Sequence, residues 1–427
     1  MRTYLGKFGG RFVPAAVLIA LALLVNPAGS VAQKETAGPR WVGSWSSAMQ
    51  APTDIFGPTW SLDGFADQTV REVVRISAGG PAVRVRLSNV YGSAPLRLAG
   101  ATVAEAGTGA SMRPGTVRPL TFHHSRSAVV PAGRELVSDP AVLPAMALDR
   151  LTVSLYFAGA TGPATFHGNA QATSYRAAGD RRFALDGSAF TETSASFYYL
   201  TGVDVVNVPR PKAAVVTFGD SITEGALSTL DENNRYPDEL AERLIATGRP
   251  RTVLNEGLSG NRVLRDSPCF GASALHRFER DVLDRPGVRT VIVSEAINDI
   301  LDIPGIPFGN DCNSPNPNLT AEQLIEGHRA LIRAAHAHGI RIVGGTVTPY
   351  KDNIYLLFTD RGEAVRDELN HWIRTSGEYD AVVDFAAAVS DPADSDFLRA
   401  DYDSGDRLHP NDAGYRAMAA AIDLDSL

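Results

Sequence analysis

The chain is poor in cysteine and carries no run of one charge. Its 427 residues include two cysteines, Cys269 and Cys312, and no histidine stands near them at the spacing of zinc ligands, which excludes a zinc site of the finger type. Acidic residues outnumber basic ones by 48 to 40, and the basic residues are scattered. We therefore expect no nucleic-acid partner and no polybasic contact with anionic membranes.

Several motifs that would indicate a particular chemistry are also missing. The sequence contains no Gly-x-Ser-x-Gly, no His-Glu-x-x-His and no phosphate-binding glycine loop. It has no internal repeat and no low-complexity tract. These absences argue against several common hydrolase and nucleotide-binding families, and nothing in the sequence implies a metal or an organic cofactor.

Long apolar runs are rare, and the one clear case lies at the N-terminus. Val13–Val25 is uncharged, follows three basic residues and precedes the small-x-small pattern Ser30-Val31-Ala32. This pattern predicts a signal peptide at residues 1–32 that is removed before Gln33. The apolar run is too short to span a bilayer comfortably, so we expect a secreted or periplasmic protein without a stable membrane anchor.

The sequence of the N-terminal half predicts β structure. Val83–Ser88 and Leu151–Tyr156 alternate strictly between apolar and polar residues, which is the period of a strand. Glycines and prolines punctuate such segments, and no long helical period appears between them. We predict an all-β sandwich or jelly-roll-like domain over residues 33–207.

The pattern changes at the proline-containing segment Val208–Pro211, where we expect a short linker. Beyond it, amphipathic helices separate short apolar runs, which we predict to be strands at Ala213–Phe218, Thr252–Asn255, Thr290–Ser294, Ile340–Thr346 and Ala381–Phe385. Such alternation implies parallel strands joined by helical crossovers. Residues 208–427 are therefore predicted to be a doubly wound, flavodoxin-like α/β domain around a five-stranded parallel sheet.

A serine stands where the first of these strands ends. Gly219-Asp220-Ser221 directly follows Ala213–Phe218. In open α/β folds, ligands bind at the carboxyl ends of the strands. A helix starting soon after Ser221 would also favour negative charge near its hydroxyl oxygen. Ser221 is therefore a candidate nucleophile, although Asp and Ser are also ordinary turn residues.

A serine hydrolase also needs a base and a carboxylate that orients it. Among the nine histidines, His409 lies in a turn-rich loop just before the last predicted helix, three residues after Asp406. Pro410 disfavours helix at His409 and keeps that loop extended. By contrast, His371 and Glu368 fall within a predicted helix and are most simply a solvated face.

Donors for an oxyanion come from the next two strand exits. Asn255–Asn261 follows the second strand and includes Gly260, whose backbone amide is exposed by its lack of a side chain. Asn298 follows the third strand and offers a side-chain amide. Each segment alone is an ordinary turn, but their order brings a nucleophile, two donors and a base to one sheet edge.

That order resembles the SGNH (GDSL-type) hydrolases over residues 212–425. Gly219-Asp220-Ser221 is similar to their first block, Gly260 to the second, Asn298-Asp299 to the third, and Asp406-x-x-His409 to the last. The resemblance implies Ser221 as nucleophile, His409 as base and Asp406 as its orienting carboxylate. It also implies an oxyanion hole from the Ser221 and Gly260 amides and the Asn298 side chain.

The match has two departures. Ile222 stands where these hydrolases have leucine after the serine, and Ala296 replaces the glycine of their third block, Gly-x-Asn-Asp. The second change is expected to shift that turn slightly while leaving Asn298 in place. The N-terminal β domain is similar to domains that precede some members, including certain carbohydrate esterases.

The segment Asp302–Asn318 is long and rich in Pro, Gly and Asn, which is typical of functional loops. It contains Cys312, while Cys269 lies in the loop after Gly260. We predict a Cys269–Cys312 disulfide that ties these loops together beside the cleft. Candidate acyl-pocket residues, each equally well explained by local packing, are Ile303, Pro304, Ile306, Phe308, Tyr350, Tyr355 and Phe358.

Two classes of function follow. The first is an exported serine esterase that cleaves small-acyl esters through an acyl-enzyme, acting either on small-molecule esters or as a polysaccharide O-acetylesterase on glycan-linked ones. The second is a non-catalytic surface- or glycan-binding protein on a hydrolase scaffold, against which the intact set of candidate site residues argues.

Overall fold

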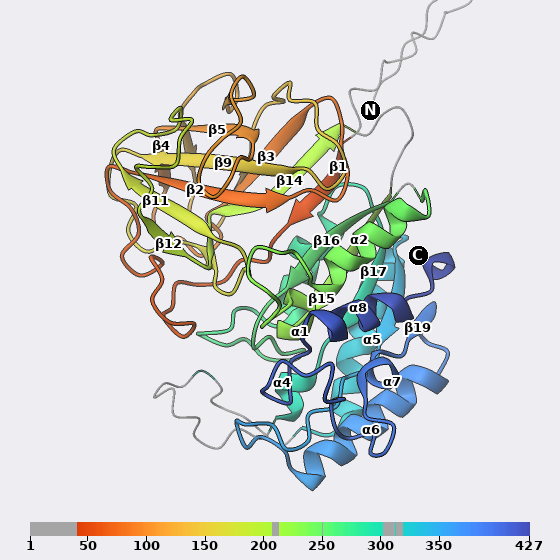
Figure 1. Cartoon of the computed structure of the whole chain (residues 1–427). Helices are drawn as coiled ribbons and strands as arrows, with labels where there is room; N and C mark the ends of the chain where they lie inside the picture. The colour runs from red at the N-terminus through yellow and green to blue at the C-terminus, as the bar shows by residue number, and fades with distance from the viewer. Residues whose placement is uncertain (1–40, 207–212, 250, 302–311, 313–318) are drawn as a thin grey trace, which may run out of the picture. The chain divides into compact units, whose positions relative to one another are not determined.

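The computed structural model describes residues 41–206, 213–249, 251–301, 312 and 319–427 (Figure 1). The predicted signal peptide at 1–32 and the linker at 208–211 lie outside these residues. Across the described part of the chain, we find no helix that combines the length and apolarity needed to cross a membrane.

Residues 41–206, called the β region below, form antiparallel sheets. The larger main sheet consists of β12 (Glu192–Ser194), β11 (Ser174–Ala178), β2 (Gln68–Arg75), β9 (Arg150–Phe157), β5 (Gly100–Glu105) and β6 (Arg118–Leu120), in that order. The second consists of β1 (Trp41–Ser46), β14 (Leu200–Val206), β3 (Val83–Ser88) and β8 (Glu135–Val137). Two small ribbons pair β10 (Phe166–His167) with β13 (Phe197–Tyr198) and β4 (Leu96–Leu98) with β7 (Ala128–Val130). The prediction of an all-β N-terminal region is confirmed.

The two strands singled out by their alternation differ in burial. In β3 the apolar residues are buried and Arg84 is half-buried, where its guanidinium donates to Asp204 at 2.7 Å. In β9 even the polar Ser154 is buried, and it accepts a hydrogen bond at 3.1 Å from Arg71, whose guanidinium also donates to the Ala110 and Ala184 carbonyls. The alternating pattern therefore located both strands, although Thr152 and Ser154 on the polar face of β9 are buried.

Residues 213–427, called the α/β region below, contain a five-stranded parallel sheet. Its strands, in spatial order, are β16 (Arg251–Gly257), β15 (Ala213–Gly219), β17 (Val288–Ser294), β18 (Arg341–Gly345) and β19 (Ala381–Val383). This is the 2-1-3-4-5 order of doubly wound, flavodoxin-like folds, as predicted. The last strand ends earlier than expected because Asp384 caps a helix that begins at Phe385.

Helices cover both faces of this sheet (Figure 1). They are α1 (Ser221–Glu224), α2 (Tyr236–Ala246), α3 (Ala274–Phe278) with the π-helical turn η1 (Glu279–Leu283), α4 (Ile297–Ile300), α5 (Ala321–Ala337), α6 (Asp360–Thr375), α7 (Phe385–Val389), α8 (Asp412–Ala421) and the 3-10 turn η2 (Leu424–Ser426). Val215 packs in one core with Leu240 of α2 and Met418 of α8, whereas its neighbour Val216 packs in another core with Leu324 of α5 and Leu369 of α6. The two-residue period of the strand sends successive side chains to opposite faces.

The β region and the α/β region share a buried junction, and contacts unite residues 39–427 in one compact unit. Strand β1 lies so close to β16 that a Cβ on Gly43 would come within 2.8 Å of a methyl carbon of Leu254. The Ser77 hydroxyl donates to the Val253 carbonyl at 3.0 Å across the same junction. A larger residue at position 43 would thus require the Leu254 side chain to move.

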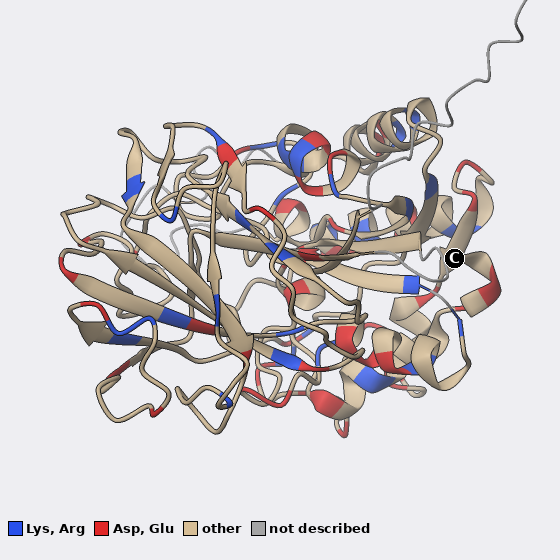
Figure 2. Ribbon diagram, turned by 90° about the horizontal axis from the view of Figure 1, so that it is seen from above, with Lys and Arg blue, Asp and Glu red and all other residues tan. Residues whose placement is uncertain are grey.

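Basic and acidic residues are interspersed over the described ribbon rather than separated into one basic and one acidic part (Figure 2). Many are paired, such as Arg329 with Glu378 at 2.7 Å. The chain as a whole carries a formal net charge of −8.

Candidate active site

Ser221 begins helix α1 directly after strand β15. Asp220 is the N-cap of this helix, and its side chain accepts a hydrogen bond from the Ile222 amide at 3.0 Å. Gly219 cannot be larger, because a Cβ there would lie 2.1 Å from the Ser294 carbonyl oxygen. The strand exit therefore places the serine hydroxyl at the carboxyl edge of the sheet, as predicted.

Ser221, His409 and Asp406 form a continuous hydrogen-bonded line. The Ser221 Oγ lies 2.9 Å from Nε2 of His409, and the other ring nitrogen, Nδ1, lies 2.6 Å from Oδ2 of Asp406. The carboxylate accepts a hydrogen bond from Nδ1–H, which leaves Nε2 free to accept a proton from the serine hydroxyl. The predicted nucleophile, base and orienting carboxylate are thus brought together.

The loop before α8 holds Asp406 in this position. Its Oδ1 accepts hydrogen bonds from the backbone amides of Leu408 at 2.9 Å and His409 at 2.8 Å. Burial by itself would raise the pKa of Asp406, but the hydrogen bonds and charge of His409 outweigh it and lower the pKa to about 2. Asp406 is therefore an anion at neutral pH, where it can stabilise a protonated imidazole.

The predicted oxyanion donors line the same cavity as Ser221 and His409. Gly260 has a φ of 73°, a left-handed conformation that favours glycine. Within the described part of the chain, neither the Ser221 amide nor the Gly260 amide donates to a protein acceptor. Asn298 donates one amide hydrogen to the Asn261 carbonyl at 2.9 Å, which orients its side chain and leaves its second hydrogen for a ligand.

Ala296 lies just before this asparagine, as the N-cap of α4, and has a φ of 124°. This backbone conformation favours glycine, and a non-glycine residue there is strained by roughly 1–3 kcal/mol. The strain explains why glycine is the usual residue of the third block. Despite it, Asp299 still accepts from the Val263 amide at 2.7 Å, so the loop that carries Gly260 stays attached to α4.

Arg277 of α3 joins the strand exits behind the site. Its guanidinium donates to the Gly219 carbonyl at 2.8 Å, the Glu256 carbonyl at 2.7 Å and the Asn261 side chain at 2.8 Å. It also stacks on the Phe218 ring at 4.0 Å. One buried cation thereby fixes the ends of β15 and β16 and the loop of the oxyanion donors relative to one another.

A cavity of about 250 Å³ opens over Ser221. Its polar lining groups come from Asn169, Ser221, Ser259, Gly260, Asn298 and His409. Its apolar lining comes from Phe56, Ala226, Leu227, Phe270, Leu301, Tyr355, Leu357 and Leu408. No Asp, Glu, Lys or Arg of the described residues lines it.

The candidate acyl-pocket residues lie in different parts of the structure. Tyr355 lines the cavity and donates to Asp406 at 3.2 Å. Tyr350 is instead fully buried in the core, and Phe358 lines a separate hollow beside Lys351. Ile303, Pro304, Ile306 and Phe308 lie outside the described residues.

The predicted disulfide is present between Cys269 and Cys312, whose Cα atoms are 5.2 Å apart. It lies beside the cavity, because Phe270 next to Cys269 is a lining residue. The Cys269 carbonyl accepts a hydrogen bond from Gln50 of the β region at 2.8 Å. The bridged loop is thus attached to both regions of the chain.

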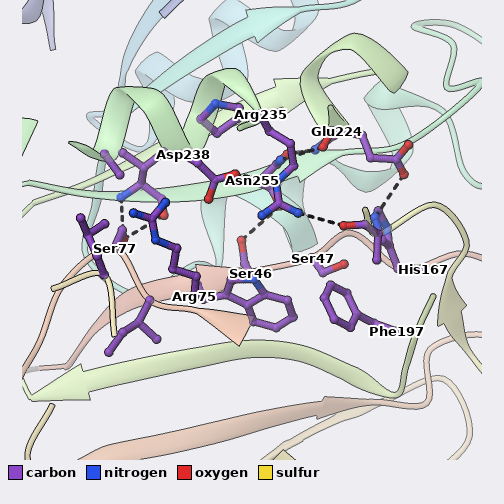
Figure 3. Close-up of a pocket in the computed structure, with 18 residues that line it drawn as sticks. Ser46, Ser47, Arg75, Ser77, His167, Phe197, Glu224, Arg235, Asp238 and Asn255 are labelled. Carbon is purple, nitrogen blue, oxygen red and sulfur yellow. Dashed lines mark hydrogen bonds and ion pairs between the residues drawn. The ribbon is translucent and has the colours of Figure 1, made fainter. Parts of the chain in front are cut away.

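A second buried group, Glu224, connects the serine helix to the β region (Figure 3). Its Oε1 lies 3.1 Å from Nε2 of His167, and its Oε2 accepts from Asn169 at 3.2 Å and from the Ser259 hydroxyl. Ser259 directly precedes Gly260. Glu224 therefore links the helix of the candidate nucleophile, the candidate oxyanion loop and two residues of the β region.

The hydrogen-bond pattern fixes the proton in this group. Nδ1 of His167 lies 2.8 Å from the Ala48 carbonyl, which can only accept, so Nδ1 carries a hydrogen. Burial raises the pKa of Glu224 to about 8 and lowers the pKa of His167 to about 4. At neutral pH the Glu224 carboxyl is therefore mostly protonated, and its Oε1 faces the unprotonated Nε2 of His167.

Glutamine should replace this protonated glutamate well, since its amide can donate to His167 and its carbonyl can accept from Ser259. In the wild type the pKa of Glu224 is raised, so Glu224 stabilises the folded state most below about pH 4.5. This stabilisation is lost as the pH rises towards 8. The pKa of His167 is lowered, so His167 stabilises the folded state most above pH 6.5. This stabilisation is lost as the pH falls towards 4. Between pH 6.5 and 8, therefore, of these two groups only Glu224 changes the stability of the folded state with pH.

We therefore expect the unfolding free energy of the wild type to fall relative to that of Glu224→Gln between pH 6.5 and 8, with a slope of about 1.4 kcal/mol per pH unit near pH 6.5 that decreases to about half of that value at pH 8. Urea unfolding of both proteins at three pH values in this range measures the difference. The exposed Glu232→Gln is the control and should show a constant difference from the wild type. A constant difference for Glu224→Gln as well would contradict the buried neutral carboxyl.

Two features of the site were not predicted from the sequence. Phe56 and Asn169 belong to the β region, and no motif or period marks them. Glu224 lies inside the first motif block, but its partner His167 is distant in sequence. By contrast, His371 and Glu368 are exposed on α6, in agreement with the interpretation of a solvated face.

No group of three His, Cys, Asp or Glu side chains in the described ranges is placed to hold a metal ion. The arrangement at Ser221 is instead suited to nucleophilic attack by a hydroxyl on a carbonyl carbon.

Comparison with protein families agrees with the geometry. A model of the GDSL-like lipase/acylhydrolase family matches residues 217–417. A search of curated protein sequences found no match.

Several solved structures are similar to the α/β region at low identity. The lipase/acylhydrolase from Enterococcus faecalis is 22% identical over 49% of this chain and 92% of its own, with a TM-score of 0.36. An acetyl xylan esterase is 19% identical over 49% of this chain and 96% of its own, with a TM-score of 0.36. The aryl esterase from M. smegmatis is 17% identical over 49% and 95%, with a TM-score of 0.37. The family match and the sheet order together show that the chain carries a hydrolase domain of the GDSL-like lipase/acylhydrolase family at residues 217–417, preceded by an all-β region.

Proposed function

We propose that the protein is an exported serine esterase that cleaves esters of small acyl groups through an acyl-enzyme. The observation that carries the proposal is the line from Ser221 Oγ to His409 Nε2 at 2.9 Å and from His409 Nδ1 to Asp406 at 2.6 Å, at the base of a cavity. Hydroxyl, imidazole and carboxylate in this order make a serine nucleophilic.

In the first step, Ser221 Oγ attacks the ester carbonyl carbon while its proton moves to Nε2 of His409. The carbonyl oxygen becomes an oxyanion, which the amides of Ser221 and Gly260 and the side chain of Asn298 stabilise. Collapse of this intermediate breaks the bond to the alcohol oxygen, which takes the proton from His409. The products of this step are the free alcohol and the Ser221 ester.

In the second step, water replaces the alcohol. His409 takes a proton from the water as its oxygen attacks the acyl carbon, and the oxyanion forms in the same place. Breakdown of the intermediate returns the proton to Ser221 Oγ and releases the carboxylic acid. Asp406 stays ionised throughout, because its pKa is lowered to about 2.

The cavity supports an uncharged substrate. Its lining is mostly apolar, and no carboxylate, ammonium or guanidinium of the described residues faces it. A charged acyl group would lose its hydration there without gaining a partner. The proposal further includes export through the predicted signal peptide at 1–32, a free or glycan-linked ester as the partner, no nucleic acid, no stable membrane anchor and no cofactor.

A fluorophosphonate that traps activated serines tests the function. We expect one adduct, on Ser221, and hydrolysis of p-nitrophenyl acetate that stops in proportion to labelling. His409→Ala should prevent both the labelling and the hydrolysis, since the serine then lacks its base. No adduct together with no hydrolysis would favour the non-catalytic binding protein, and release of acetate from acetylated xylan but not from p-nitrophenyl acetate would favour the O-acetylesterase.

A further inference from the structure

Phe56 is a residue of the β region that reaches the cavity over Ser221. It lies in the connection between β1 and β2, more than a hundred residues before the first motif of the hydrolase domain. Its ring meets the ring of Phe270 with centroids 6.1 Å apart at 61°. An aromatic side chain from outside the hydrolase domain thus forms part of the cavity wall.

Glycines on both sides hold this aromatic pair in place. A Cβ on Gly168 of the β region would lie 2.3 Å from the Phe56 ring, and a Cβ on Gly260 would lie 2.3 Å from the Phe270 ring. Phe56 therefore packs against the backbone of its own region, and Phe270 packs against the candidate oxyanion loop. The hydrogen bond from Gln50 to the Cys269 carbonyl at 2.8 Å holds the two sides together.

The proposed chemistry determines which part of an ester meets this wall. Four groups surround the reacting carbon: the serine oxygen, the oxyanion, the leaving alcohol and the acyl chain. The alcohol oxygen must receive a proton from Nε2 of His409, so the alcohol lies on the side of Leu408 and Tyr355, which adjoin the base and line the cavity. Phe270 packs against Gly260 of the candidate oxyanion loop, and the wall that it forms with Phe56 is the one assigned here to the acyl chain.

We infer that Phe56 is a specificity-determining residue that limits the length of the acyl group, so that the β region forms part of the acyl site. The inference rests on the proposed esterase function and extends it to substrate choice. It assigns the site an apolar, uncharged acyl group of short chain length, because the wall is made of two phenyl rings and the cavity measures about 250 Å³.

Removing the ring should open the acyl site. We expect Phe56→Ala to raise the ratio of kcat/KM for p-nitrophenyl octanoate over acetate by about tenfold or more, since fit of a single methylene in an apolar pocket changes kcat/KM by about 10- to 200-fold. Phe56→Leu, which keeps apolar bulk, should give a smaller rise in the same direction. Activity on acetate esters of rising alcohol length should not change in rank order.

The matched control is Phe183→Ala, which removes a phenyl ring of the β region that is 54% exposed and does not line the cavity. It should leave unchanged the activity on esters of rising acyl length and the activity on acetate esters of rising alcohol length. Thermal melting checks that the variants are folded, and Phe56→Leu provides the test if Phe56→Ala does not fold.

An unchanged octanoate-to-acetate ratio in a folded Phe56 variant would overturn the inference and leave the esterase function standing. A change in the alcohol series alone would also overturn it, because it would place Phe56 on the leaving-group side. If the wild type shows no hydrolysis that depends on Ser221, the proposed function fails and this inference fails with it.

Discussion

Ser221→Ala is expected to lower kcat for p-nitrophenyl acetate by about 10⁶-fold. Alanine has no oxygen to attack the carbonyl, so no acyl-enzyme forms. What remains is binding in the cavity and stabilisation of an oxyanion by Gly260 and Asn298, which together retain about 10³- to 10⁴-fold over water in serine hydrolases whose serine is removed.

The expected loss concerns catalysis and not folding. Ser221 is largely buried, and alanine there removes one hydrogen bond, to His409, at a cost of about 1 kcal/mol of unfolding free energy. Initial rates of enzyme purified from a host without secreted esterases, with unfolding curves for each protein, separate the two effects.

Ser228→Ala is the matched control for this substitution. Ser228 is also buried, follows the same helix, and has a hydroxyl that makes no hydrogen bond to any described residue. Its replacement should leave kcat near the wild-type value. If Ser221→Ala retained more than a thousandth of the wild-type activity, the covalent mechanism would be wrong, and a water activated directly by His409 would have to replace it.

The hydrolase domain was largely predictable because its signals are local. Each strand of the parallel sheet is a short apolar run, and the first three motifs follow strand exits, as Ser221 does after β15 and Asn298 after β17. The last motif, with Asp406 and His409, lies instead in the loop before α8. Because the carboxyl ends of parallel strands lie at one edge of the sheet, residues that follow these strands are expected to form a common site. The helix caps were local as well: Asn411 begins α8 by accepting from the Gly414 amide at 3.0 Å.

The contribution of the β region was not predictable, because it depends on packing between distant segments. Phe56 and Asn169 reach the cavity only because the β region lies against the exits of β15 and β16. Nothing in their neighbouring residues distinguishes them from other loop residues. The burial of Ser154 in β9 has the same origin, because it depends on Arg71 and the distant segments that Arg71 contacts and not on the alternation of the strand.

The third block keeps a backbone conformation that its residue does not favour. Position 296 is alanine, where the related hydrolases have glycine, and its φ is 124°. The hydrogen bonds of Asn298 to Asn261 and of Asp299 to Val263 hold the turn in this conformation. Attachment of α4 to the neighbouring loop thus outweighs the preference of one residue.

Asp406→Asn is expected to lower kcat by about 10⁴-fold while leaving the fold intact. The reason lies in the donors around the carboxylate. Its Oδ1 accepts from two backbone amides, of Leu408 and His409, which cannot become acceptors. The carbonyl oxygen of an asparagine must therefore occupy the Oδ1 position, and its amide nitrogen must occupy the Oδ2 position, 2.6 Å from Nδ1 of His409.

That amide nitrogen can only donate, so Nδ1 of His409 must give up its hydrogen and accept. In a neutral imidazole the hydrogen then sits on Nε2, which faces the Ser221 hydroxyl at 2.9 Å. A protonated Nε2 cannot take the serine proton, so the base is lost even though every heavy atom keeps its place. Because the pKa of Asp406 is lowered to about 2, the wild type has a carboxylate at this position at every pH used in the assay.

Asp403→Asn is the control within the same loop. Asp403 accepts from the amides of Gly405 and Arg407 but does not touch His409, and asparagine supports the same kind of turn, so kcat should stay within about threefold of the wild type. Steady-state kinetics of both variants, with fluorophosphonate labelling of Ser221, make the comparison. Wild-type activity in a folded Asp406→Asn protein would mean that the tautomer of His409 is set by another group, and Tyr355, the other partner of Oδ2 at 3.2 Å, is the group the structure offers.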